Sequence, residues 1–85
     1  SVEEQLANEA RIAQVAENVI EVSQEQAEKA REHEIHCKTL EGSIESLMDA
    51  ANHPEVSNWR TLGMTPDEIR LEIAVKLSAF ERECL

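Results

Sequence analysis

The sequence has few of the residues that make tight turns or large aromatic cores. Among 85 residues there are two Gly and two Pro, and the only aromatic side chains are Trp59 and Phe80. Because β-hairpins depend on such turn residues, this composition argues against a β-rich domain and predicts an all-α fold. A core of Leu, Ile, Val and Ala with so few rings will be thin, and small thin cores are often completed by association with another chain.

Basic residues are also scarce. Eight Lys and Arg stand against 18 Asp and Glu, which gives a net charge of −10. Residues 1–34 are the most acidic part, with nine acidic and three basic side chains. Such a surface repels the phosphates of nucleic acids and anionic lipids, so we expect no direct binding to DNA or RNA and no docking on a membrane. A basic protein partner is compatible with this charge.

No apolar run approaches the length of a membrane span, and no signal peptide opens the sequence. Two cysteines in an otherwise ordinary composition do not make a disulfide scaffold. These observations predict a cytoplasmic protein in a reducing environment. If the chain is a fragment of a longer protein, the missing signal carries no information.

A long helix, or two helices in succession, is predicted for residues 2–51. Residues 2–41 contain neither Gly nor Pro and are rich in Ala, Glu, Gln, Arg and Lys, which lose little conformational freedom in a helix. Apolar residues recur at spacings of 3, 4 and 3, at Ile12, Val15, Val19 and Val22. Ala13, Ala16 and Ile20 widen the face that these four residues form. Together with Leu6 these four form what we call the N-terminal seam: Leu6, Ile12, Val15, Val19 and Val22. The same register continues with four polar residues, Gln26, Lys29, His33 and His36, before Leu40 and Leu47 resume the pattern.

The second half of the chain carries clear start and stop signals. Pro54 and Gly63 bracket a segment in which one or two helical turns could carry Trp59. Thr65, Pro66 and Glu68 then form a capping box with Pro at the first helical position, which predicts a helix from Pro66 to about Cys84. Its apolar positions predict the buried face, which Leu71 and Val75 are expected to broaden: Ile69, Ile73, Leu77, Phe80 and Cys84.

The lengths of the two halves do not match. A helix over residues 66–84 is roughly 28 Å long, and folding back it would cover the preceding helix only as far as about residue 33. We therefore expect a single helical domain, 1–85, with an overhanging amphipathic helix over 1–32 and a helical hairpin over 33–85. The uncovered seam predicts a coiled-coil contact with another chain, either in a homo-oligomer (a dimer) or with another helical protein. The alternative is a turn at residues 23–26, which would give a closed three-helix bundle.

Two groups of side chains are candidates for a specific chemical role. His33 and Cys37 lie on one helical face, and the hairpin returns Cys84 to the same level, so these three side chains are candidates for a zinc site or for a Cys37–Cys84 disulfide. A buried thiol beside a polar histidine is the third interpretation. Five glutamates form what we call the Glu stripe, which is either a solvated face or a surface for a basic protein: Glu17, Glu21, Glu25, Glu28 and Glu32.

Catalysis finds no support, since the sequence has neither a Gly-rich phosphate loop nor a recognisable nucleophile motif. No cofactor is predicted. We therefore predict a non-catalytic protein–protein interaction or oligomerisation module that uses the N-terminal seam, of the kind found among phage and bacterial accessory proteins. The alternative is an acidic inhibitor or adaptor that presents Glu17, Glu21 and Glu25 to a basic, nucleic-acid-binding protein. Trp59, next to Arg60, either closes the hairpin or anchors a partner.

Overall fold

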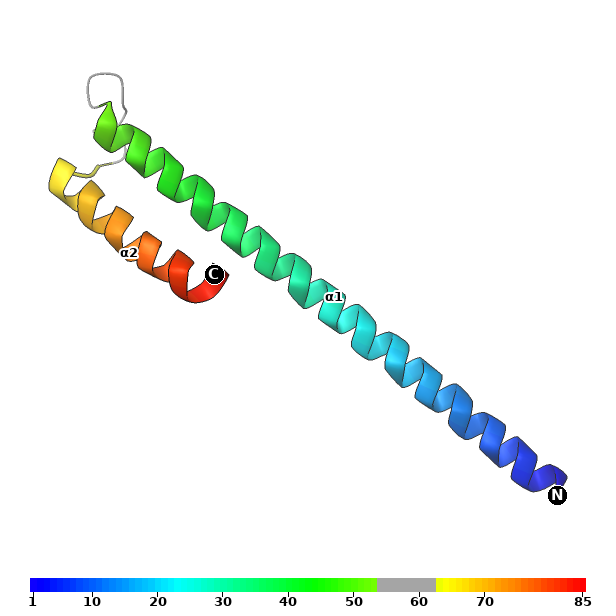
Figure 1. The fold of residues 1–85 in the computed structure, drawn as a ribbon. Coiled ribbons are helices and arrows are strands. Elements are labelled where there is room, and N and C mark those ends of the chain that lie inside the picture. The colour runs from blue at the N-terminus through cyan, green and yellow to red at the C-terminus, as the bar shows by residue number, and fades with distance from the viewer. Residues whose placement is uncertain (54–62) are drawn as a thin grey trace. The chain divides into compact units, whose positions relative to one another are not determined.

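In the computed structural model the chain is all-α, as predicted (Figure 1). The structure describes residues 1–53 and 63–85, and in these it contains two helices, α1 (Val2–Asn52) and α2 (Pro66–Cys84), and no strand. The chain divides into two compact units, residues 1–33 and residues 34–85, which are described separately below. Neither α1 nor α2 is long and apolar enough to cross a membrane.

Helix α1 runs without a break through residues 23–26, so the turn required by the three-helix alternative is absent from it. Ion pairs between side chains four residues apart support this polar part of the helix. The Lys29 Nζ atom lies 3.9 Å from Glu25 Oε1 in the first unit. At the other end, the backbone N–H of His53 donates to the carbonyl of Asp49, and a proline follows, which disfavours helical backbone in the residue before it.

Helix α2 begins where its capping signals predict. The Glu68 backbone N–H donates to Thr65 Oγ1, and the Thr65 backbone N–H donates to Glu68 Oε1, both at 3.2 Å. Thr65 has extended backbone and Pro66 is the first helical residue, so the capping box is complete. Met64, just before the cap, packs against the core that Ile69 completes, as expected of a hydrophobic staple. Local sequence is therefore sufficient to place this helix start.

Removing the cap is expected to weaken the second unit. Thr65→Ala leaves the Glu68 N–H without its side-chain acceptor and should lower the free energy of unfolding by about 1 kcal/mol. Urea unfolding followed by circular dichroism measures this change. Ser78→Ala, at an exposed position inside α2, is the matched control and should not destabilise the protein. Equal unfolding midpoints for Thr65→Ala and the unmodified chain would contradict the proposed role of the cap.

The second unit is a helical hairpin with a thin core. In Figure 1, α2 lies beside the C-terminal part of α1. Leu47 and Ala50 of α1 pack with Ile69 of α2, which is 1% exposed, while Met64 and Ile73 cover the cluster. Ile44 is also buried, one turn before Leu47. The core among the described residues therefore consists of small and medium aliphatic side chains.

The predicted broadening of the buried face of α2 is wrong. Leu71 is 66% exposed and Val75 is 55% exposed. Each follows a core residue, Ile69 or Ile73, by two positions, which on a helix is a rotation of about 200° around the axis. With one helix to pack against, α2 can bury one side only, so Leu71 and Val75 lie on its outer side.

Candidate interaction surface

The N-terminal seam lies entirely in the first unit, and all its side chains are exposed to solvent. Ile12, Val15 and Val19 are 69%, 60% and 59% exposed, and Leu6 and Val22 are also more than half exposed. Throughout residues 1–33 there is no buried or half-buried residue. The helix therefore carries an ordered row of large apolar side chains, which are far better buried than hydrated.

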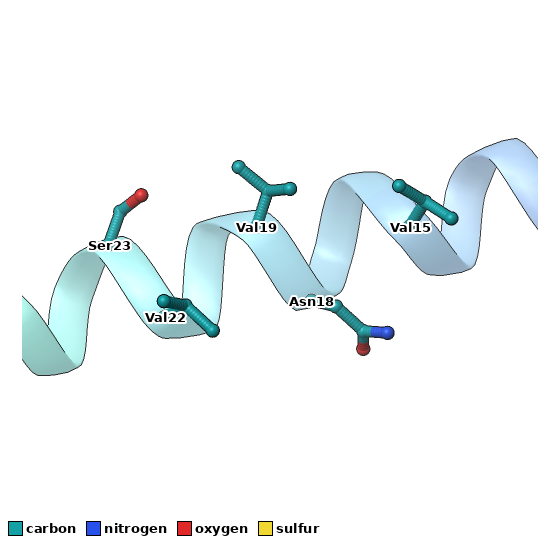
Figure 2. A pocket seen from close by; sticks show the side chains of 5 residues that line it. All are labelled: Val15, Asn18, Val19, Val22 and Ser23. Carbon is teal, nitrogen blue, oxygen red and sulfur yellow. The ribbon is translucent and has the colours of Figure 1, made fainter.

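Part of the seam forms a shallow groove along α1. Figure 2 shows Val15, Val19 and Val22 following one another along the helix, with Asn18 and Ser23 beside them. These five residues line a space of about 280 Å³. The Gln14 side-chain amide donates to Asn18 Oδ1 at 3.0 Å, so this polar neighbour is held by a bond on its own helix. Apart from Asn18 and Ser23 the lining is aliphatic, which suits an apolar knob from another helix.

The Glu stripe occupies a different side of the same helix. At about 100° per residue, Glu17 lies roughly opposite the middle of the seam residues 12–22, while Glu21 and Glu25 lie roughly 140° and 100° around the helix from it. All three are exposed. Over residues 12–25 acidic and apolar surfaces are thus segregated, which is the pattern of a helix with one face to bury and one face to keep in water, while Leu6 lies on the side of Glu17. Burial of the seam leaves the stripe solvated.

The hairpin has a second apolar surface, beside its core. Ile44 of α1 and Leu77 and Phe80 of α2 line a space of about 240 Å³, whose edge carries Glu41 and Glu45. We call these five residues the hairpin groove. Leu77 was predicted to be buried, yet it is 46% exposed because it lies at the rim of the contact between the helices. The apolar periodicity of α2 identifies Leu77 as a residue of the apolar face. Only the packing of the two helices shows that its side chain stays partly exposed.

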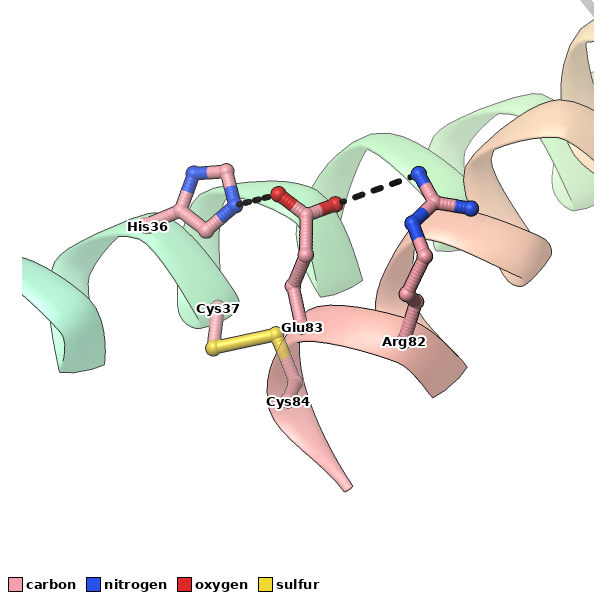
Figure 3. Close-up of a disulfide and its surroundings, with 5 residues drawn as sticks. All are labelled: His36, Cys37, Arg82, Glu83 and Cys84. Carbon is pink, nitrogen blue, oxygen red and sulfur yellow. Dashed lines mark hydrogen bonds and ion pairs between the residues drawn. A yellow bond between two sulfur atoms is a disulfide. The ribbon is translucent and has the colours of Figure 1, made fainter.

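A disulfide joins the two helices of the hairpin at its open end. Cys37 and Cys84, 47 residues apart in sequence, are bonded with their Cα atoms 5.8 Å apart (Figure 3). His36 Nε2 lies 3.2 Å from Glu83 Oε1, beside the disulfide. Glu83 also lies 3.8 Å from Arg82 Nη2. These polar contacts are half exposed and add little stability compared with the covalent bond.

The structure thus contains the disulfide, one of the three alternatives predicted for Cys37 and Cys84. Zinc is bound by thiolates, and a disulfide provides none, so the metal alternative with His33 stays a prediction for the reduced chain. Trp59 lies outside the described residues. Neither the zipper contact of the seam nor a partner for Glu17, Glu21 and Glu25 is tested by a single chain, and both remain predictions.

Comparison of this chain with models of protein families, with curated proteins and with solved structures finds no match. The functional argument therefore depends on the surfaces described above.

Proposed function

We propose that this protein is a non-catalytic protein–protein interaction module that self-associates through its N-terminal seam, most simply as a dimer. The observation that carries the proposal is the exposure of every large side chain of the seam, from 51% at Val22 to 69% at Ile12. The second unit supports the proposal by contrast. Ile44 and Leu47 belong to the same helix, and they are buried because α2 packs against them.

The energetic case rests on helix stability as well as on burial. Each large aliphatic side chain moved from water into an interface contributes on the order of 1.5 kcal/mol when fully buried, and the seam has five. Isolated helical segments are marginally stable in water, and most helices in proteins are stabilised by packing of an apolar face. Association through the seam removes its apolar side chains from water and also stabilises the helix that carries them. The Glu stripe remains in water.

Absolute mass in solution tests the proposal. We expect light scattering after size exclusion to give a mass that rises from 9.6 kDa for one chain toward twice that value as concentration increases. Because apolar contacts are little screened by salt, the mass should be the same at low and high ionic strength. A mass of one chain at every concentration would overturn self-association.

A second candidate is an acidic adaptor or inhibitor that binds a basic protein through the Glu stripe. The exposure of Glu17, Glu21 and Glu25, on a side of α1 other than that of the seam residues 12–22, supports it, since both surfaces can then be used together. Such a complex should weaken steeply with ionic strength, unlike the seam contact. We propose a cytoplasmic accessory protein in either case, in which Cys37 and Cys84 would be held as thiols by the reducing environment.

A further inference from the structure

Three side chains that bind transition metals lie close together beside the disulfide. A ring nitrogen of His33 and the sulfur atoms of Cys37 and Cys84 all lie within 4.8 Å of one another. His33 and Cys37 are four residues apart in the unbroken helix α1, so the register of this one helix places the imidazole beside the Cys37 sulfur. Cys84 belongs to the last turn of α2 and is held at Cys37 by the disulfide (Figure 3).

The spacing of these three atoms is close to that of zinc ligands. Zn–S bonds of about 2.3 Å and Zn–N bonds of about 2.0 Å at tetrahedral angles separate two sulfur ligands by about 3.8 Å and a sulfur from a nitrogen by about 3.5 Å. Once the S–S bond is broken, rotation of the Cys37 and Cys84 side chains brings their sulfurs to this separation, since the two Cα atoms are 5.8 Å apart. Two thiolates and an imidazole favour Zn²⁺ over Mg²⁺ and Ca²⁺, which prefer oxygen ligands.

The three side chains are accessible to an ion from solution. His33 is exposed, and Cys37 and Cys84 are half-buried. A metal site needs such an entry path. The net charge of −10 also favours the approach of a cation over that of an anion.

The hairpin has little to hold this end together when the disulfide is absent. Its core cluster contains Leu47 and Ala50 of α1, and Cys37 lies ten residues before Leu47, about 15 Å along the helix. Domains of this size commonly depend on a disulfide or on a structural metal ion. In the cytoplasmic location proposed above the disulfide is reduced, and a metal ion is then the cross-link that these side chains can still form.

We infer that His33, Cys37 and Cys84 bind one Zn²⁺ ion when the disulfide is reduced, and that the ion replaces the disulfide as the link between α1 and α2. Two molecules of a thiol reductant are oxidised to their own disulfide, and Cys37 and Cys84 each gain a proton and an electron. Zn²⁺ then displaces the two thiol protons and binds the two thiolates and the imidazole, with a water in the fourth position. The thiolates balance the charge of the ion. The inference does not depend on self-association through the N-terminal seam.

Metal titration of the full chain under a phosphine reductant tests the inference, because a phosphine opens the disulfide without adding thiols that compete for zinc. We expect the reduced chain to bind one Zn²⁺ per chain and the oxidised chain to bind none at this site. Zinc should raise the melting temperature of the reduced chain and leave that of the oxidised chain unchanged. Co²⁺ in place of Zn²⁺ should give thiolate charge-transfer absorption and the intense visible bands of a tetrahedral ion.

Two histidine variants provide a matched pair. His33→Ala removes one of three protein ligands and should raise the zinc dissociation constant by about 100-fold or more, beyond the 10- to 100-fold typical of outer-shell partners. His36→Ala removes the neighbouring imidazole, whose Nε2 lies 3.2 Å from Glu83 Oε1, and should bind zinc as tightly as the unmodified chain. Circular dichroism establishes that both variants keep their helices. The Cys37→Ser, Cys84→Ser double variant should bind no zinc at this site.

The outcomes are separable from those for the proposed function. One zinc per reduced chain that is weakened by His33→Ala and kept by His36→Ala supports the site. A reduced chain that binds no zinc, one zinc shared by two chains, equal affinity in His33→Ala, or binding that persists in the double cysteine variant overturns it. None of these results decides self-association, which is tested by the mass of the oxidised chain in the absence of metal.

Discussion

Replacement of Val15 and Val19 by Asp is expected to convert the associated protein into a monomer. Both side chains lie in the middle of the N-terminal seam, where a carboxylate would have to leave water on association; the nearest basic side chain, Arg11, lies one turn before Val15 and two turns before Val19. Each dimer would carry four such groups, so the dissociation constant should rise by at least about 1,000-fold. Light scattering and sedimentation equilibrium measure this change directly.

The helix itself should survive this double substitution. Val and Asp have similar helix propensities, so the change removes apolar surface without adding a helix breaker. The hairpin contains neither residue, and its unfolding midpoint should stay within experimental error. A matched control adds the same charge outside the seam, with Gln14→Asp and Gln24→Asp, and should remain associated. If the seam variant keeps the mass of the unmodified protein, the seam is not the contact.

Loss of the disulfide is expected to produce the largest change in stability. In the chain-entropy account, closing a loop of 47 residues stabilises the folded state by about 4 kcal/mol. The core that holds the hairpin together is small, with Ile69 as its one side chain below 2% exposure among the described residues. Since a unit of this size has little other stabilisation, reduction should lower its melting temperature strongly and unfold part of α2.

Thermal unfolding with and without a thiol reductant measures this effect. The Cys37→Ser, Cys84→Ser double variant should melt at the temperature of the reduced protein and should not respond to the reductant, which separates the bond from other effects of the reagent. Identical melting curves for the oxidised and reduced protein would show that the helix contacts suffice. The result also bears on location, because a reducing cytoplasm would hold the chain in its less stable state.

The sequence by itself determined the all-α class, the start of α2 and the position of the N-terminal seam. These features depend on residues within one or two turns of each other: the Thr65–Glu68 capping box, and apolar residues repeating every three or four positions. Helix propensity and capping act locally, so no knowledge of the other helix is needed to predict them.

Only the tertiary structure decided which of the apolar residues are buried and how the cysteines are used. Leu71 and Ile69 look alike in sequence, but one neighbouring helix can cover only one side of α2. Leu77 is apolar and periodic, yet it is open because it borders the contact rather than filling it. The sequence left three alternatives for Cys37 and Cys84: a zinc site, a disulfide or a buried thiol. In the hairpin their Cα atoms lie 5.8 Å apart and the two residues form a disulfide. Burial and covalent pairing are properties of two segments together, and a sequence pattern describes one segment at a time.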